Sequence, residues 1–164
     1  MIAQLRVDDR LIHGQVALVW TKELDTPGIV VANDNAANNE MVKMTLKMAT
    51  PTGKKLLIRS VDDAIKVFNN PKGKDMRMFA LTNSVQDALK IAQNVSEIDG
   101  INVANVGRFA DNADQSIQLN STLMLDQNEL IALKELVKLN IPVFNQVVPS
   151  NNKTAITSLL KNVN

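Results

Sequence analysis

Short apolar runs alternate with segments of helical spacing along most of the chain. The apolar runs predict strands at residues 2–7, 29–33, 56–58, 76–81, 100–103 and 142–148. Between them, apolar residues recur with a period near 3.6, which predicts helices at residues 15–24, 39–48, 61–68, 85–95, 126–139 and 154–163. This alternation indicates a single-domain α/β fold with a mostly parallel central sheet and helices on both faces.

Capping residues support several of these helix starts. The pairs that suggest capping are Ser60 with Asp63, Ser84 with Asp87, and Asp126 with Glu129. The asparagine-rich stretches at residues 33–39 and 150–152 are typical of loops, and residues 105–116 are polar and turn-like. Residues 117–125 are expected to hold one or two short extended pieces.

The helix at residues 39–48 carries a stripe of methionines at positions 41, 44 and 48. Methionine is flexible and fills irregular gaps in protein interiors. We therefore expect the stripe to fill the core and not to bind a ligand.

Composition narrows the class of function. The 164 residues fit one domain, and 45% of them are hydrophobic, which is typical of a globular protein. The chain has 18 basic and 17 acidic residues, so no strongly basic surface for nucleic acid is expected. It has no tyrosine and one tryptophan, so aromatic side chains on which bases could stack are scarce. The absence of cysteine excludes disulfides, thiolate catalysis and cysteine-bound metals, and it fits a cytosolic protein. No apolar run is long enough to span a bilayer, and the first ten residues do not resemble a signal peptide.

The only histidine, His13, lies between the first predicted strand and the first predicted helix. In parallel α/β folds, ligands bind at the carboxyl ends of strands. Gly14 allows close backbone approach, the following helix start favours an anion, and the guanidinium of Arg10 suits phosphate. Asp8 or Asp9 is expected to fix the imidazole tautomer, but not both, because two carboxylates would repel a phosphoryl group. A surface ion pair of Arg10 with one of these aspartates is the alternative.

Motifs of several rival functions are absent. No G-x-G-x-x-G follows the first strand, and no G-x-S-x-G occurs. Gly53 and Lys54 do not form a nucleotide-binding P-loop, because positions 48 and 55 are Met and Lys. A receiver-type phospho-acceptor domain needs an aspartate after the third strand, where this chain has Arg59 and Ser60.

The stretch Val7-Asp8-Asp9-Arg10-Leu11-Ile12-His13-Gly14-Gln15-Val16 closely resembles the signature of the IIB subunit of mannose/fructose/sorbose-type sugar phosphotransferase systems. Further similarities to this family are Trp20-Thr21-Lys22, Asn33-Asp34, Asn105-Val106-Gly107 and Gln146-Val147-Val148-Pro149. The resemblance covers residues 1–164, which we therefore expect to be one IIB domain.

The resemblance implies that His13 is phosphorylated transiently at Nδ1 while Nε2 is anchored. Phosphorylated IIA would donate the phosphoryl group, and a sugar held by the membrane subunits IIC and IID would receive it. The protein would thus be a protein-Nπ-phosphohistidine–sugar phosphotransferase, cytoplasmic and peripherally associated with the membrane through IIC/IID, and plausible as a homodimer. The expected site comprises His13, Arg10, Asp8 and Asp9, with Gly14 and Gln15 near the phosphate, and needs no metal or organic cofactor.

Two large partners must reach His13 in turn, so we expect it to be exposed on a rim. An apolar surface is expected around it, for which Leu11 and Ile12 are candidates, although either also suits the core. The chain departs from the family pattern at Arg108, where glycine is common, and at Phe144-Asn145, where a charged pair is usual. A non-catalytic regulatory paralogue that senses an anion in the same pocket is the alternative function.

Overall fold

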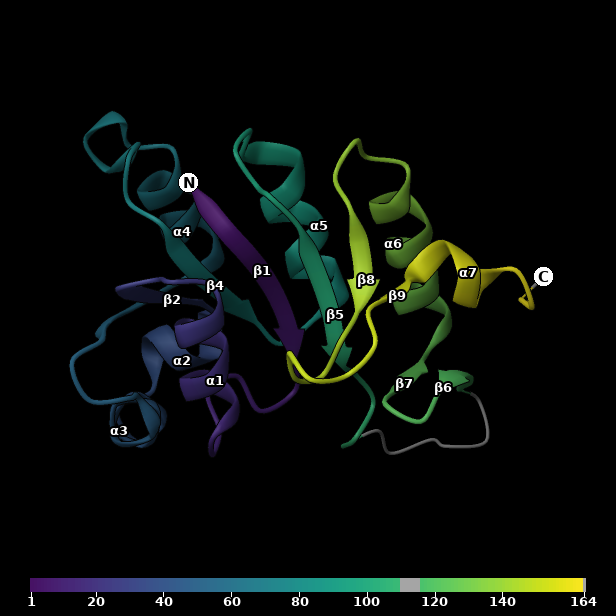
Figure 1. Ribbon diagram of the computed structural model, residues 1–164, viewed down its shortest axis with the longest axis horizontal. Coiled ribbons are helices and arrows are strands. Elements are labelled where there is room, and N and C mark those ends of the chain that lie inside the picture. The colour runs from purple at the N-terminus through teal and green to yellow at the C-terminus, as the bar shows by residue number, and fades with distance from the viewer. Residues whose placement is uncertain (110–115, 164) are drawn as a thin grey trace.

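The computed structural model describes residues 1–109 and 116–163, and within these ranges the chain forms an α/β fold around a seven-stranded sheet (Figure 1). The strand order is β3-β2-β4-β1-β5-β8-β9, parallel throughout except that β9 runs antiparallel to β8. The strands are β1 (Ile2–Asp8), β2 (Gly28–Ala32), β3 (Lys55–Arg59), β4 (Met78–Thr82), β5 (Ile101–Asn105), β8 (Val143–Asn145) and β9 (Thr154–Ala155). A separate antiparallel hairpin consists of β6 (Ile117–Asn120) and β7 (Leu123–Leu125).

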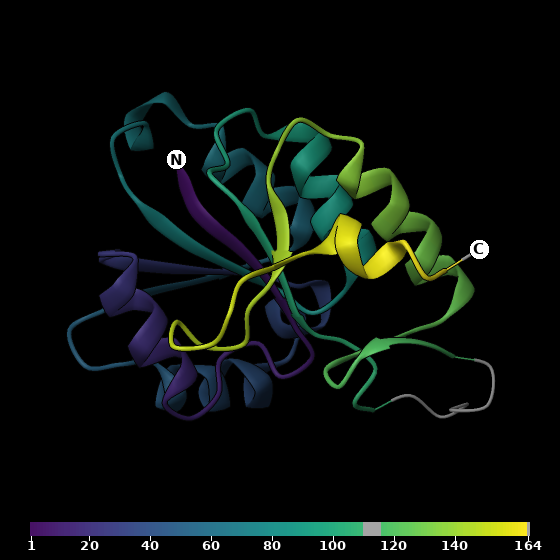
Figure 2. The same ribbon diagram turned by 45° about the vertical axis from the view of Figure 1, so that its right-hand side comes forward.

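Helices cover both faces of the sheet, as the alternating pattern predicts (Figures 1 and 2). One face packs against α1 (Val16–Glu23), α2 (Asp34–Asn38) and α3 (Glu40–Ala49). The other packs against α4 (Val61–Phe68), α5 (Val85–Asn94), α6 (Gln127–Val137) and α7 (Ile156–Leu160). A short 3₁₀ helix, η1 (Pro71–Gly73), precedes β4. The expected capping side chains are present at α4, α5 and α6, and Asp126 with Glu129 forms a reciprocal capping box.

The central strand β1 lies between β4 and β5, and all seven of its residues are buried. Side chains alternate between the faces of a strand. Leu5 and Val7 therefore enter the core on the α5 side, whereas Arg6 reaches the opposite side and its guanidinium lies 5.9 Å from the ring centre of Trp20 in α1. A central parallel strand is usually apolar on both faces. The polar residues Gln4, Arg6 and Asp8 in β1 thus form a buried polar row that ends at the carboxyl edge of the sheet.

The sequence-based boundaries differ most from the structure in three places. Residues 33–39 are not a simple loop, because Asn33 accepts a hydrogen bond from the backbone N–H of Ala36 (2.8 Å) and starts α2. The strand expected at 142–148 ends at Asn145, and the helix expected at 154–163 begins only after β9. The five residues of α2 carry too few apolar positions to show a helical period.

The methionine stripe of α3 is not core filling, contrary to the sequence-based expectation. Met41, Met44 and Met48 are 78%, 64% and 81% exposed. The inner face of α3 is instead formed by Val42, Leu46 and Ala49, which pack with the sheet and α1.

Gly107 fixes the connection after β5, and we expect Gly107→Ala to destabilise the fold strongly. Its φ is +92°, and an added Cβ would lie 2.1 Å from the carbonyl oxygen of Met124. Backbone strain and displacement of β7 together should lower the free energy of unfolding by at least about 3 kcal/mol, measured by urea denaturation. Gly53→Ala is the control, because Gly53 has φ +85° but nothing within 4 Å of the added Cβ. Gly53→Ala should lower the free energy of unfolding by only about 1–2 kcal/mol. Equal losses for the two variants would contradict the close approach at Gly107.

Candidate functional site

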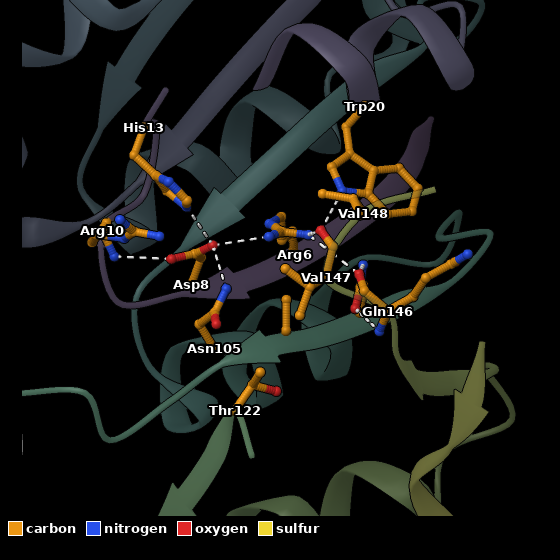
Figure 3. Close-up of polar contacts among 12 residues, drawn as sticks. Arg6, Asp8, Arg10, His13, Trp20, Asn105, Thr122, Gln146, Val147 and Val148 are labelled. Carbon is orange, nitrogen blue, oxygen red and sulfur yellow. Dashed lines mark hydrogen bonds and ion pairs between the residues drawn. The ribbon is translucent and has the colours of Figure 1, made fainter. Parts of the chain in front are cut away.

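The loop between β1 and α1 turns back on itself and places His13 beside the end of β1 (Figure 3). The backbone N–H of Leu11 donates to the carbonyl of Asp8 (3.0 Å), and Leu11 adopts a positive φ of 57°. A positive φ costs a non-glycine residue about 1–2 kcal/mol. Burial of the Leu11 and Ile12 side chains in the α1-side core offsets this cost. Both residues belong to the core, which is the alternative that the sequence left open, and they do not form an apolar surface around His13.

The carboxylate of Asp8 is the centre of the site (Figure 3). Its Oδ2 lies 2.9 Å from Nε2 of His13 and accepts from Nη2 of Arg6 at 2.9 Å. The amide of Asn105, at the end of β5, donates to the same oxygen at 3.1 Å. The backbone N–H of Arg10 donates to Oδ1 at 3.1 Å. Of the two candidate aspartates, Asp8 is therefore the one that contacts His13.

The charge of Arg6 keeps Asp8 ionised although water does not reach it. Burial alone would raise the pKa of Asp8, but the charge of Arg6 and hydrogen bonds from His13 and the Arg10 backbone outweigh burial, and the pKa is lowered. Burial lowers the pKa of Arg6, a change that the Asp8 charge opposes. An ionised carboxylate can only accept hydrogen bonds, so the proton of neutral His13 is assigned to Nε2. Among the described residues, Nδ1 of His13 has no hydrogen-bond partner.

Asp9 has a different role in the structure. Its Oδ2 accepts from the backbone N–H of Arg108 at 2.8 Å, which ties the β1–α1 loop to the segment after β5. Burial raises the pKa of Asp9, and the nearby charge of Asp8 raises it further, against the backbone hydrogen bonds from Arg108 and Gly107. Asp9 thus positions two neighbouring loops and does not contact the imidazole.

The other expected site residues are Arg10, Gly14 and Gln15, which lie on the same loop as His13. Among the described residues, the Arg10 side chain takes part in no ion pair, so the alternative pairing with Asp8 or Asp9 is absent. Gly14 has φ +49°, and Gln15 precedes α1 without donating or accepting a side-chain capping bond. Side chains of Asn33, Asn39, Ser60, Ser84 and Asp126 cap the starts of α2 to α6. The uncapped start of α1 therefore leaves backbone N–H groups available to an anion beside His13.

The imidazole is less exposed than expected, since only 14% of the His13 side chain is accessible. A groove of about 650 Å³ lies between α1 and the β8–β9 loop, and Gln15, two residues after His13, is part of its lining. Its lining includes Gln15, Val16, Val19, Val148 and Pro149. Its valines and Pro149 give this groove an apolar lining, whereas Leu11 and Ile12 are buried.

The β8–β9 loop is fastened to the site by two buried donors. Nη1 of Arg6 and Nε1 of Trp20 both donate to the carbonyl of Val147, at 3.0 and 2.9 Å. Sequence reasoning missed the role of Arg6 and of the Asn105 amide. A signal was available in the alternation of Gln4, Arg6 and Asp8 within a strand expected to be buried on both faces.

Two further properties concern the described part of the chain. Residues 1–109 and 116–163 contain no group of three or more histidine, aspartate or glutamate side chains placed to hold a metal ion. None of the helices in these ranges has the length and apolar character that crossing a bilayer requires.

Comparisons with known proteins agree on one family. The family model for the sorbose subfamily IIB component of the phosphotransferase system matches residues 2–164. A probable phosphotransferase enzyme IIB component from Streptococcus pyogenes serotype M6 is 56% identical, over 98% of this chain and 99% of its own. The mannose-specific EIIAB component of Escherichia coli K12 is 30% identical over 99% of this chain, which spans 49% of that longer protein. The crystal structure of the IIB domain of the Klebsiella pneumoniae sorbose permease superposes with a TM-score of 0.90 at 30% identity, covering 100% of this chain and 98% of that one.

Because the Arg6–Asp8 pair is buried, we expect Asp8→Asn to lower the free energy of unfolding. The variant should also lose the part of that free energy that depends on acidic pH. Loss of one partner leaves the other charge buried and unpaired, at a cost of about 3–5 kcal/mol. The lowered pKa of Asp8 means that its contribution is complete above the ordinary carboxyl value of 3.8 and is lost as pH falls through the folded-state pKa. Urea unfolding across acidic pH should show this loss in the wild type and a flatter profile in Asp8→Asn.

Asp9→Asn is the matched control, because the two carboxyl groups are neighbours with opposite pKa shifts. The raised pKa of Asp9 means that its ionisation opposes folding as pH rises through the carboxyl range. At neutral pH, Asp9→Asn should change the unfolding free energy by less than about 1 kcal/mol. If Asp9→Asn were the more damaging change, the assignment of Asp8 as the central carboxylate would be wrong.

Proposed function

The chain belongs to the sorbose subfamily of phosphotransferase-system IIB components, and on this premise we propose that His13 carries the phosphoryl group between two partner proteins. The observation that carries the proposal is the 2.9 Å contact between Nε2 of His13 and the ionised carboxylate of Asp8. It holds the proton on Nε2 and leaves the lone pair of Nδ1 free to act as the nucleophile.

In the first transfer, Nδ1 attacks the phosphorus of phosphohistidine on IIA. The nitrogen–phosphorus bond of the donor breaks as the new bond to Nδ1 forms. The phosphorylated ring becomes cationic, and Asp8 stabilises it through the Nε2–H hydrogen bond. Phosphoryl transfer depends mainly on positioning and charge compensation, which a buried, fully bonded carboxylate provides without a catalytic triad.

Charge on the phosphoryl oxygens is compensated from the same loop. The guanidinium of Arg10, which forms no ion pair with the described residues, supplies a positive charge. Gly14 and Gln15 lead into the start of α1, which has no side-chain cap. Backbone N–H groups at a helix start bind phosphate oxygens well. Asp9 contributes indirectly, because its bond to the Arg108 backbone holds the loop on which Arg10 lies.

In the second transfer, a sugar hydroxyl bound by the membrane subunits IIC and IID attacks the phosphorus. The Nδ1–P bond breaks, the hydroxyl proton is released, and sugar phosphate leaves. The protein would act as one IIB domain, residues 1–164, on the cytoplasmic side of the membrane, docked on IIC/IID. The fused EIIAB relative from E. coli supports IIA as the kind of donor.

We expect phosphate from phosphoenolpyruvate to appear on this protein when the general phosphocarriers and the cognate IIA are present. The label should be acid-labile and base-stable, as a phosphohistidine is, and absent from His13→Ala. Phosphorus NMR of the wild type should assign it to Nδ1. Unchanged labelling of His13→Ala would refute the proposal. Phosphate binding without labelling, and without sugar phosphate in the presence of IIC/IID membranes, would favour the regulatory alternative.

Arg10→Gln should slow labelling by about 100-fold, the usual effect of removing one group that stabilises transition-state charge. The free energy of unfolding should stay near the wild-type value, because the Arg10 side chain forms no ion pair with the described residues. Arg59→Gln, at the end of the edge strand β3, is the control and should label at the wild-type rate. Rapid-quench measurement of the labelling rate tests both variants, and equal rates for the two would exclude a role for Arg10.

A further inference from the structure

Helix α3 presents three methionines on a surface that no other described residue covers. Met41, Met44 and Met48 are each more than half exposed, and we call these three residues the methionine face. Their spacing of three and four residues places them on one stripe of the helix. Exposed apolar side chains gathered in one place mark an interaction site more often than scattered ones do.

The core does not account for the methionine face. The residues of α3 that pack inward are Val42, Leu46 and Ala49, which already fill the contact with the sheet. Replacing exposed methionines by polar residues would therefore leave that contact intact. The methionines serve neither the core nor the His13 site described above.

Basic residues outnumber acidic ones in the stretch of sequence that contains the methionine face. The segment 39–59 contains five basic residues and one acidic residue, although the whole chain has a net charge of only +1. Lys43 and Lys47 lie on the helix itself, and Lys47 is exposed beside Met44. Glu40 pairs with Lys43 at 3.3 Å, whereas Lys47 takes part in no ion pair with the described residues.

We propose that the methionine face, with Lys43 and Lys47, binds an anionic lipid surface. Such a surface matches both features at once. The boundary between headgroups and acyl chains takes up flexible apolar side chains, while lipid phosphates attract the lysines. A neutral apolar protein groove would cover the methionines but would leave the basic charge unmatched.

The biological role of this lipid contact rests on the proposed function, but the contact itself is not part of that function. Transfer to a sugar held by IIC/IID takes place at a membrane, and a direct lipid contact would keep the protein there between encounters. Figures 1 and 2 show α3 toward the same end of the molecule as the carboxyl ends of β1 and β5, where the β1–α1 loop lies. Lipid bound at α3 would thus hold the His13 end near the bilayer.

Flotation with vesicles tests the proposal on the full chain. The wild type should bind vesicles made of equal amounts of phosphatidylglycerol and phosphatidylcholine. It should not bind vesicles made of phosphatidylcholine alone. Higher salt should weaken the binding because it screens the lysines. The triple variant Met41→Gln, Met44→Gln, Met48→Gln should bind at least about tenfold more weakly. The double variant Lys43→Gln, Lys47→Gln should bind these vesicles about 30-fold more weakly than the wild type.

Matched controls separate this surface from general stickiness. Met76→Gln removes a methionine that is 47% exposed outside the methionine face. Lys66→Gln with Lys138→Gln removes two lysines that, like Lys43, pair with an acidic residue three positions away. Both controls should bind like the wild type. Circular dichroism should confirm that every variant is folded.

Absence of wild-type binding to the anionic vesicles, or equal binding by the triple variant, would overturn the inference. A wild type that is dimeric without lipid, does not bind vesicles and becomes monomeric in the triple variant would show that the face joins two copies instead. His13 labelling by phosphorylated IIA in solution is measured separately and should be unchanged in the triple variant. A failure of lipid binding with normal labelling rejects only this inference, and lipid binding without labelling rejects only the proposed function.

Discussion

An ionised carboxylate with no access to water is the feature on which this structure depends. Asp8 is fully buried, and an isolated charge there would be too costly to persist. It is stable because a buried guanidinium, an imidazole, an amide and a backbone N–H all donate to it. Each donor comes from a different position along the chain, so the charge is satisfied only when β1, β5 and the β1–α1 loop are in place.

The same network couples parts of the molecule that are far apart in sequence. Arg6 contacts both Asp8 and the carbonyl of Val147, which also accepts from Trp20 in α1. The loop beyond β8 is thereby held against α1, which fixes both walls of the groove between them. A buried polar network favours one arrangement over its competitors when most of its groups are bonded. In this network, Nε of Arg6 is buried without a hydrogen-bond partner among the described residues. Here that arrangement orients a single imidazole nitrogen toward its carboxylate.

Sequence patterns predicted most of the fold because local rules and the tertiary structure agree in most elements. The helix α4 has the predicted bounds, and its start and those of α5 and α6 are capped by the predicted side chains. The disagreements have specific causes. A one-and-a-half-turn helix such as α2 gives no periodic signal, and an apolar stripe such as the methionines of α3 does not reveal which of two faces the sheet will cover.

The amino-acid sequence was enough to predict the strand–helix alternation, the position of His13 after the first strand, and the family to which its loop is similar. Those properties follow from periodicity and from residue types that are adjacent in the chain. Tertiary structure alone decided which aspartate holds the histidine, because Asp8 and Asp9 are neighbours that differ only in the direction their side chains take from the end of β1. It also decided the roles of Arg6 and Asn105, and the exposure of the methionines, because these depend on contacts between segments that only folding brings together.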